Sequence, residues 1–72
     1  MRTVDLVRQI ERAARNGTPR KTCEVAREDA TFSVLRCGTT SFTVPREPET
    51  NDHTARAVRR FLERELGEQW WL

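Results

Sequence analysis

The chain has few of the residues from which catalytic centres, metal sites and enclosed pockets are usually built. Its 72 residues include one histidine, two cysteines, three glycines and no tyrosine, and only 36% of them are hydrophobic. A chain of this length buries only about 60% of the surface that its unfolded form exposes. We therefore expect one domain over residues 1–72 with a thin core and no cavity, and we expect no cofactor.

Long apolar runs and clusters of metal ligands are also missing. No apolar stretch approaches the about 18 residues that a membrane span needs, and the start Met1-Arg2-Thr3-Val4-Asp5 is charged. We expect a soluble, cytoplasmic protein that does not contact a membrane. Cys23 and Cys37 are too few for a secreted disulfide framework and lack metal-ligand spacing, so we expect reduced, packed cysteines and no metal.

Charge is plentiful but nearly balanced. Thirteen basic residues face eleven acidic ones, which gives a net charge of +2, and all the basic residues except Lys21 are arginines. The excess positive charge falls in the two terminal segments, 1–16 and 53–72. Arginine suits bidentate contact with phosphate, although a GC-rich genome would enrich arginine equally well.

Two segments carry apolar residues at spacings of three and four, which is typical of helices with one buried face. The first covers residues 3–15, with Thr3 as its cap and Asn16-Gly17 at its end. The second begins near Asn51 or Asp52 and ends at Gly67. The expected buried residues are Leu6, Val7, Ile10, Ala13 and Ala14 in the first helix and Ala55, Val58, Phe61, Leu62 and Leu66 in the second.

Between these helices, apolar residues alternate with polar ones, which predicts three short strands with one buried face. A two-residue turn at Glu28-Asp29 would place Val25 opposite Phe32 and Cys23 opposite Val34. A three-residue loop at Cys37-Gly38-Thr39 would place Val34 opposite Phe42 and Phe32 opposite Val44. Both registers put the large apolar side chains on the same face of the sheet.

The expected architecture is an α+β fold in the order helix, three-stranded antiparallel sheet, helix. Both helices should cover the apolar face of the sheet, because that face must be buried against another element. The opposite face should be polar and free to meet a partner. It would carry Thr22, Glu24, Thr31, Ser33, Leu35, Ser41 and Thr43.

This order of elements, the hairpin from Arg27 to Arg36, the strand end Phe42-Thr43-Val44-Pro45 and the helix start Thr54-Ala55-Arg56-Ala57-Val58-Arg59 resemble the HicA family of bacterial and phage toxins. The resemblance covers nearly the whole chain and implies a double-stranded-RNA-binding-like fold and cleavage of messenger RNA. It also implies RNA and a HicB-like antitoxin protein as partners. The family places a catalytic histidine at the opening of its second strand, near Asp29 to Phe32 here, where this chain has none.

The single histidine, His53, stands at the expected start of the second helix. A helix N-terminus favours a neutral imidazole, which can accept a proton, so His53 is a candidate catalytic base. The alternative is that His53 is a solvated neighbour of the capping residues Asn51 and Asp52.

Arginine ridges on both helices, together with two hydroxyl residues of the hairpin, form the candidate RNA surface. Such ridges could follow phosphates, or they could be solvated helix surfaces with compensating glutamates. Trp70 and Trp71 in the aromatic tail, residues 67–72, could stack on bases, anchor a partner protein or join two copies of the chain, and one of them could instead fold over the core. The RNA-binding candidates are Arg8, Arg12, Arg15, Arg56, Arg59, Arg60, Arg64, Thr31 and Ser33.

Two functions follow from these features. One is a HicA-like toxin that binds RNA and cleaves it if a displaced group replaces the missing histidine. The other is a non-catalytic relative that serves as an RNA-binding or protein-binding adaptor. An unrelated α+β module with the same element order is a third explanation of the pattern.

Overall fold

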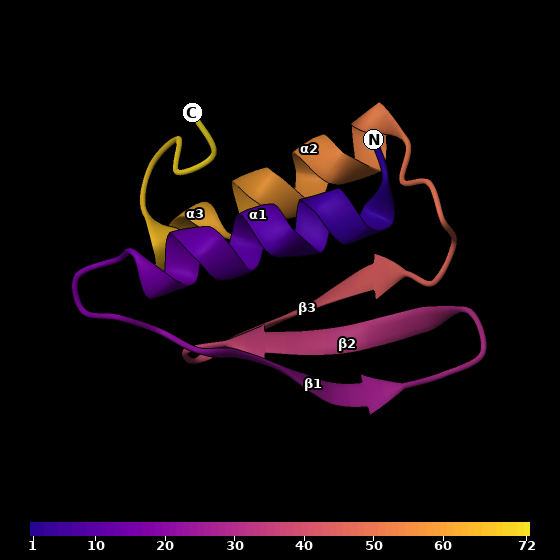
Figure 1. Ribbon diagram of the computed structural model, residues 1–72, viewed down its shortest axis with the longest axis horizontal. Helices are drawn as coiled ribbons and strands as arrows, with labels where there is room; N and C mark the ends of the chain where they lie inside the picture. The colour runs from indigo at the N-terminus through magenta and orange to yellow at the C-terminus, as the bar shows by residue number, and fades with distance from the viewer.

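The computed structural model describes all 72 residues and has the expected α+β architecture. Three antiparallel strands form one sheet in the order β1-β2-β3, and the helices all lie on one side of it (Figure 1). The other side of the sheet is left uncovered. The elements are α1 Thr3–Arg15, β1 Cys23–Glu28, β2 Phe32–Cys37, β3 Thr40–Pro45, α2 Asp52–Phe61 and α3 Glu63–Leu66.

Helix α1 has the predicted bounds and buries Leu6, Ile10 and Ala14 of the predicted stripe. The expected cap is wrong, because Arg2 holds the N-cap position and makes no side-chain cap bond. The Thr3 hydroxyl instead donates to the carbonyl oxygen of Glu47 at 2.6 Å and lies 2.7 Å from the hydroxyl of Thr50. Thr3 thus joins the start of α1 to the connection between β3 and α2.

The second helix is shorter than the sequence predicts. Its start is capped by Asn51, whose side-chain oxygen accepts from the backbone N–H of Thr54 at 2.8 Å. The helix ends at Phe61, its C-cap Leu62 is fully buried, and the four-residue helix α3 follows. Phe61, the last residue of α2, lies outside the core and is 43% exposed.

The strand registers differ from the predicted ones. The turn between β2 and β3 contains only Gly38 and Thr39, so that Cys37 pairs with Thr40. Gly38 has φ +62°, a conformation that favours glycine at the first central position of a two-residue hairpin turn. One residue fewer in the turn moves every pair along by one position, and Phe42 lies opposite Leu35 instead of Val34.

The β1–β2 turn is longer than predicted, and β1 contains a bulge between Val25 and Arg27. Asp29 organises this turn: its N–H donates to the carbonyl oxygen of Phe32 at 2.9 Å, and its carbonyl oxygen accepts from the Arg46 guanidinium at 2.7 Å. Val25 consequently pairs with Leu35 and Cys23 with Cys37.

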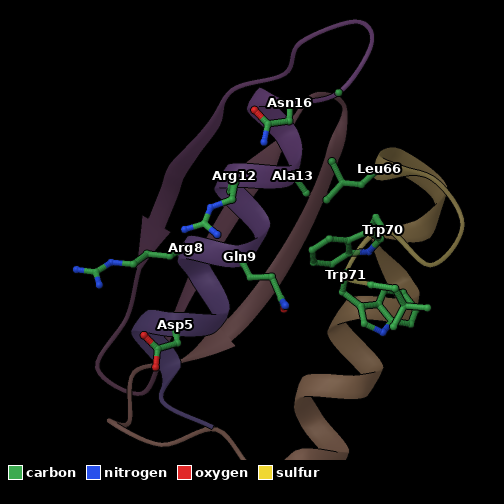
Figure 2. Close-up of a pocket in the computed structure, with 11 residues that line it drawn as sticks. Asp5, Arg8, Gln9, Arg12, Ala13, Asn16, Leu66, Trp70 and Trp71 are labelled. Carbon is green, nitrogen blue, oxygen red and sulfur yellow. The ribbon is translucent and has the colours of Figure 1, made fainter.

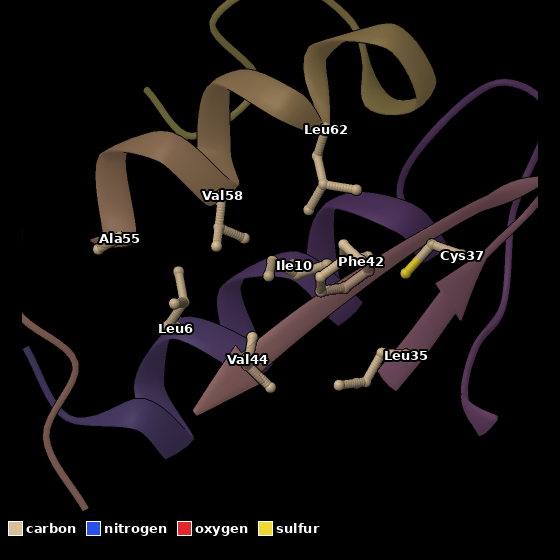
Figure 3. Close-up of a cluster of buried hydrophobic side chains, with 9 residues drawn as sticks. All are labelled: Leu6, Ile10, Leu35, Cys37, Phe42, Val44, Ala55, Val58 and Leu62. Carbon is tan, nitrogen blue, oxygen red and sulfur yellow. The ribbon is translucent and has the colours of Figure 1, made fainter. Parts of the chain in front are cut away.

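A shift of one residue exchanges the faces of a strand. Leu35, expected on the free face, is buried, whereas Phe32 and Val34 lie on the side away from the helices and are half-buried. Val25 pairs with Leu35 and so lies on the helix side, but it is 57% exposed. Figure 3 shows the core between the two layers, formed by Leu6, Ile10, Leu35, Cys37, Phe42, Val44, Ala55, Val58 and Leu62.

Cys23 and Cys37 form a disulfide, so the expectation of reduced cysteines is wrong. The two residues lie directly opposite each other on β1 and β2, with their Cα atoms 4.1 Å apart. Their sequence spacing carried no sign of this contact, because it depends on the strand register.

A network around the Glu65 carboxylate joins α3 to the far end of the sheet. The carboxylate accepts from the Lys21 ammonium, from the Thr40 hydroxyl at 2.7 Å and from the Thr39 hydroxyl at 3.0 Å and N–H at 3.1 Å. The Lys21 contact, followed by that of Thr40, lowers the pKa of Glu65 from 4.5 to about 2. The carboxylate therefore stays ionised through the whole neutral range.

Candidate nucleic-acid interface

The structure brings part of the arginine ridge of α1 and both tryptophans together around one open groove. Arg8 and Arg12 extend along one side of α1, and Trp70 and Trp71 lie on its other side (Figure 2). Both arginine side chains are exposed. Groove residues that were not among the candidate binding residues are Asp5, Gln9, Ala13, Asn16, Gly17, Leu66 and Leu72.

The two tryptophans have different environments within this groove. Trp70 folds back over the core, as expected for one of the pair, and its indole N–H donates to the carbonyl oxygen of Arg59 at 2.8 Å. Trp71 packs edge-on against it, with ring centroids 5.7 Å apart and an interplanar angle of 85°. Trp70 is thus anchored, and Trp71 is the more peripheral aromatic group.

Arg59 does not belong to an exposed ridge. Its side chain is half-buried between the helices, where Nε donates to the side-chain oxygen of Gln9 at 3.0 Å and the guanidinium lies 3.0 Å from the sulfur of Met1. These side-chain contacts hold α2 against α1. The backbone carbonyl oxygen of the same residue, Arg59, anchors Trp70. Arg59 therefore does not line the groove but anchors the tail that forms one side of it.

The remaining candidate arginines are distributed around the helix layer. Arg15 is exposed at the end of α1. Arg56 and Arg60 are exposed on α2 and line a shallow depression with His53. The guanidinium of Arg64 lies 5.1 Å from the ring centre of Phe61, in position for a cation–π contact. None of these four lines the groove between α1 and the tail.

His53 is exposed at the second position of α2, and its side chain takes part in no hydrogen bond or ion pair. General acid–base catalysis needs a group that is held at hydrogen-bonding distance from the reacting atoms. The depression around His53 offers Arg56, Ala57 and Arg60 and no second acid or base. His53 therefore has no positioned catalytic partner.

The hairpin residues of the candidate set do not form a common polar surface. Thr31 is exposed in the β1–β2 turn, where its carbonyl oxygen accepts from the N–H of Arg46 at 3.0 Å. Ser33 is half-buried on the same side of β2 as Leu35, because of the shifted register. The expectation that Ser33 lies on the free face is wrong.

No group of histidine, cysteine and acidic residues lies in an arrangement that could hold a metal ion. None of the helices has both the length and the apolar character that a membrane crossing requires.

The chain matches no protein-family model, and no curated protein or solved structure shows significant similarity to it.

Proposed function

We propose that this protein is a HicA-like, cytoplasmic RNA-binding protein that acts by contact, with a HicB-like antitoxin as its partner in a toxin–antitoxin system. The observation that supports RNA contact is the groove that joins Arg8 and Arg12 to Trp70 and Trp71. Contact is favoured over cleavage because His53 stands alone and the hairpin lacks the histidine of the family pattern.

The groove suits single-stranded RNA. Guanidinium groups bind phosphates and release counterions, whereas an accessible indole stacks on any base. Arg8 and Arg12 stand one helical turn apart, so they can meet successive points of one backbone. Trp71 would stack on a base on the opposite side of α1 from the two arginines. The contact with Trp70, which is anchored to Arg59, fixes the position of Trp71.

The test measures binding of a fluorescently labelled single-stranded RNA by anisotropy as a function of salt. We expect Arg12→Gln to weaken binding and to reduce the salt slope by about 0.7, the value for one phosphate contact on a single strand. Trp71→Leu should lower the affinity between about 5-fold and 150-fold, which corresponds to the loss of one stacked base.

Arg20→Gln is the matched control, because Arg20 is an exposed arginine that lies outside the groove and forms no hydrogen bond or ion pair. Equal losses for Arg12→Gln and Arg20→Gln would refute a localised groove. Cleavage of the RNA by the native protein, abolished in His53→Ala, would refute action by contact alone.

A further inference from the structure

The outer edge of β3 differs from the outer edge of β1. Sheet edges expose unpaired backbone groups, and soluble proteins usually protect them with charges, bulges or covering elements. The β1 edge carries the charged residues Glu24, Arg27 and Glu28 and a bulge. The six residues of β3, Thr40–Pro45, include no charge, and their pairing with β2 is regular throughout.

The backbone groups that β3 leaves free can be assigned from its ladder. The N–H of Arg46 donates to the carbonyl oxygen of Thr31, which makes this a hydrogen-bonded pair at the end of the β2–β3 ladder. Because hydrogen-bonded and non-hydrogen-bonded pairs alternate in antiparallel strands, Val44 and Phe42 also face β2 with their backbone groups. Ser41 and Thr43 consequently direct N–H and C=O outward, and the Pro45 carbonyl oxygen joins them.

A hollow lies beside these free groups, between β3 and α2. Its floor and wall are formed by Ser41, Phe42, Thr43, His53, Thr54, Ala57, Val58 and Phe61. Phe61 is the main apolar surface here, since it is 43% exposed whereas Phe42 and Val58 are buried. The hollow shares no residue with the groove between α1 and the tail.

The rim of this hollow is basic along α2, whereas Glu47 and Glu49 lie beyond its other end, beside Pro45 and Thr54. Arg56 and Arg60 are exposed beside His53 and Ala57, and Arg64 covers the Phe61 ring. The nearby carboxylates of Glu63 and Glu65 are engaged, with the Gln69 N–H and with Lys21 respectively. The rim therefore presents three arginines to whatever occupies the hollow.

We propose that the β3 edge and the hollow beside α2 form a docking site for an extended acidic segment of another protein. The segment adds as a fourth strand, its backbone pairing with Ser41 and Thr43. Every second side chain of this strand faces α2. Among those side chains, apolar ones pack on Ala57 and Phe61, and carboxylates pair with Arg56 and Arg60. The basic rim disfavours a second copy of the chain, because antiparallel pairing of two β3 edges would bring the two sets of arginines together.

The experiment uses a short synthetic peptide whose α2-facing positions are alternately valine and glutamate, with threonine at the positions between them, and the same peptide with lysine in place of glutamate as the charge control. Binding to the full chain is followed by fluorescence anisotropy and by the amide resonances of Ser41 and Thr43. We expect the glutamate peptide to shift both resonances and the lysine peptide to leave them unchanged. Reversal of charge in Arg56→Glu/Arg60→Glu should weaken the glutamate peptide roughly tenfold and favour the lysine peptide.

A matched pair of variants isolates the backbone contact. Thr43→Pro removes an outward N–H without removing a donor from the β2 ladder, and edge strands tolerate proline at such positions. Thr43→Val keeps the N–H and changes only the side chain. We expect Thr43→Pro to lose binding of the glutamate peptide and Thr43→Val to retain it. A glutamate peptide that is N-methylated at alternate amides tests the same backbone contact on the unaltered protein, and it should not bind.

Three results would overturn the proposal. The first is equal binding of the glutamate and lysine peptides. The second is a dimer in sizing chromatography that Thr43→Pro dissociates, which would assign the edge to a second copy. The third is a labelled RNA that shifts the Ser41 and Thr43 resonances in place of the peptide.

Discussion

Reduction of the Cys23–Cys37 disulfide should remove a large share of the stability of this protein. The bond joins residues 14 positions apart and so closes a loop of about 15 residues in the unfolded chain. Loop-closure entropy for such a loop stabilises the native state by about 3 kcal/mol. A single core in a chain this short rarely supplies more than about 3 to 5 kcal/mol, so the disulfide accounts for a large share of the total.

The assay is urea unfolding followed by tryptophan fluorescence, because Trp70 and Trp71 pack on the folded helix layer. With a urea dependence of about 1 kcal/mol per molar, reduction should lower the midpoint by about 3 M. Cys23→Ala/Cys37→Ala serves as the control, since its midpoint should not respond to the reductant.

The result that would refute this reasoning is an unchanged midpoint after complete reduction, or two free thiols in native protein purified without reductant. Disulfides are rare in reducing compartments. In a reducing compartment such as the cytoplasm, the protein would therefore have the lower stability of its disulfide-free form unless a bound partner stabilises it.

Further predictions concern the helix that follows α2. The folded-state pKa of Glu65 is lowered from 4.5 to about 2, so its ionised carboxylate stabilises the fold above the unfolded pKa. This stabilisation disappears as the pH falls from about 4.5 to about 2. In Glu65→Gln, the free energy of unfolding should therefore fall less over this pH range. An unaltered acid unfolding curve would contradict the Lys21–Glu65 contact. Leu62→Ala should lower the free energy of unfolding by about 3 kcal/mol, because Leu62 is fully buried. Leu66→Ala, at a half-buried position, should lower it clearly less, and denaturant titration of both variants measures the difference.

Local sequence signals predicted α1 and the fold class but not the strand registers. Gly17 and Pro19 come shortly after the end of α1 and stop the helix. The apolar residues of α1 fit only one helical face. In β2 both phases carry apolar residues: Phe32 and Val34 in one, Leu35 and Cys37 in the other. The turn length decides between them, and Gly38 is compatible with turns of either length.

The groove was beyond sequence reasoning for a different reason. Its second wall depends on the path of the tail, which reverses at Gly67 with φ +98° and at Gln69 with φ +51°. The arginines and tryptophans could be named from the sequence, but nothing local indicates that Trp70 returns to the carbonyl of Arg59. The position of Arg59 itself, half-buried beside Gln9, is a tertiary contact of the same kind.

The carboxylate of Glu65 gives one exposed turn amide an unusual property. The N–H of Thr39 would ordinarily exchange its hydrogen with water rapidly, since it lies in a solvent-exposed turn, but here it donates to Glu65 at 3.1 Å. Its exchange then requires the Glu65 carboxylate to leave the turn, a local opening that can occur without global unfolding. The exchange rate of this one amide would therefore measure how firmly that carboxylate is held at the end of the sheet.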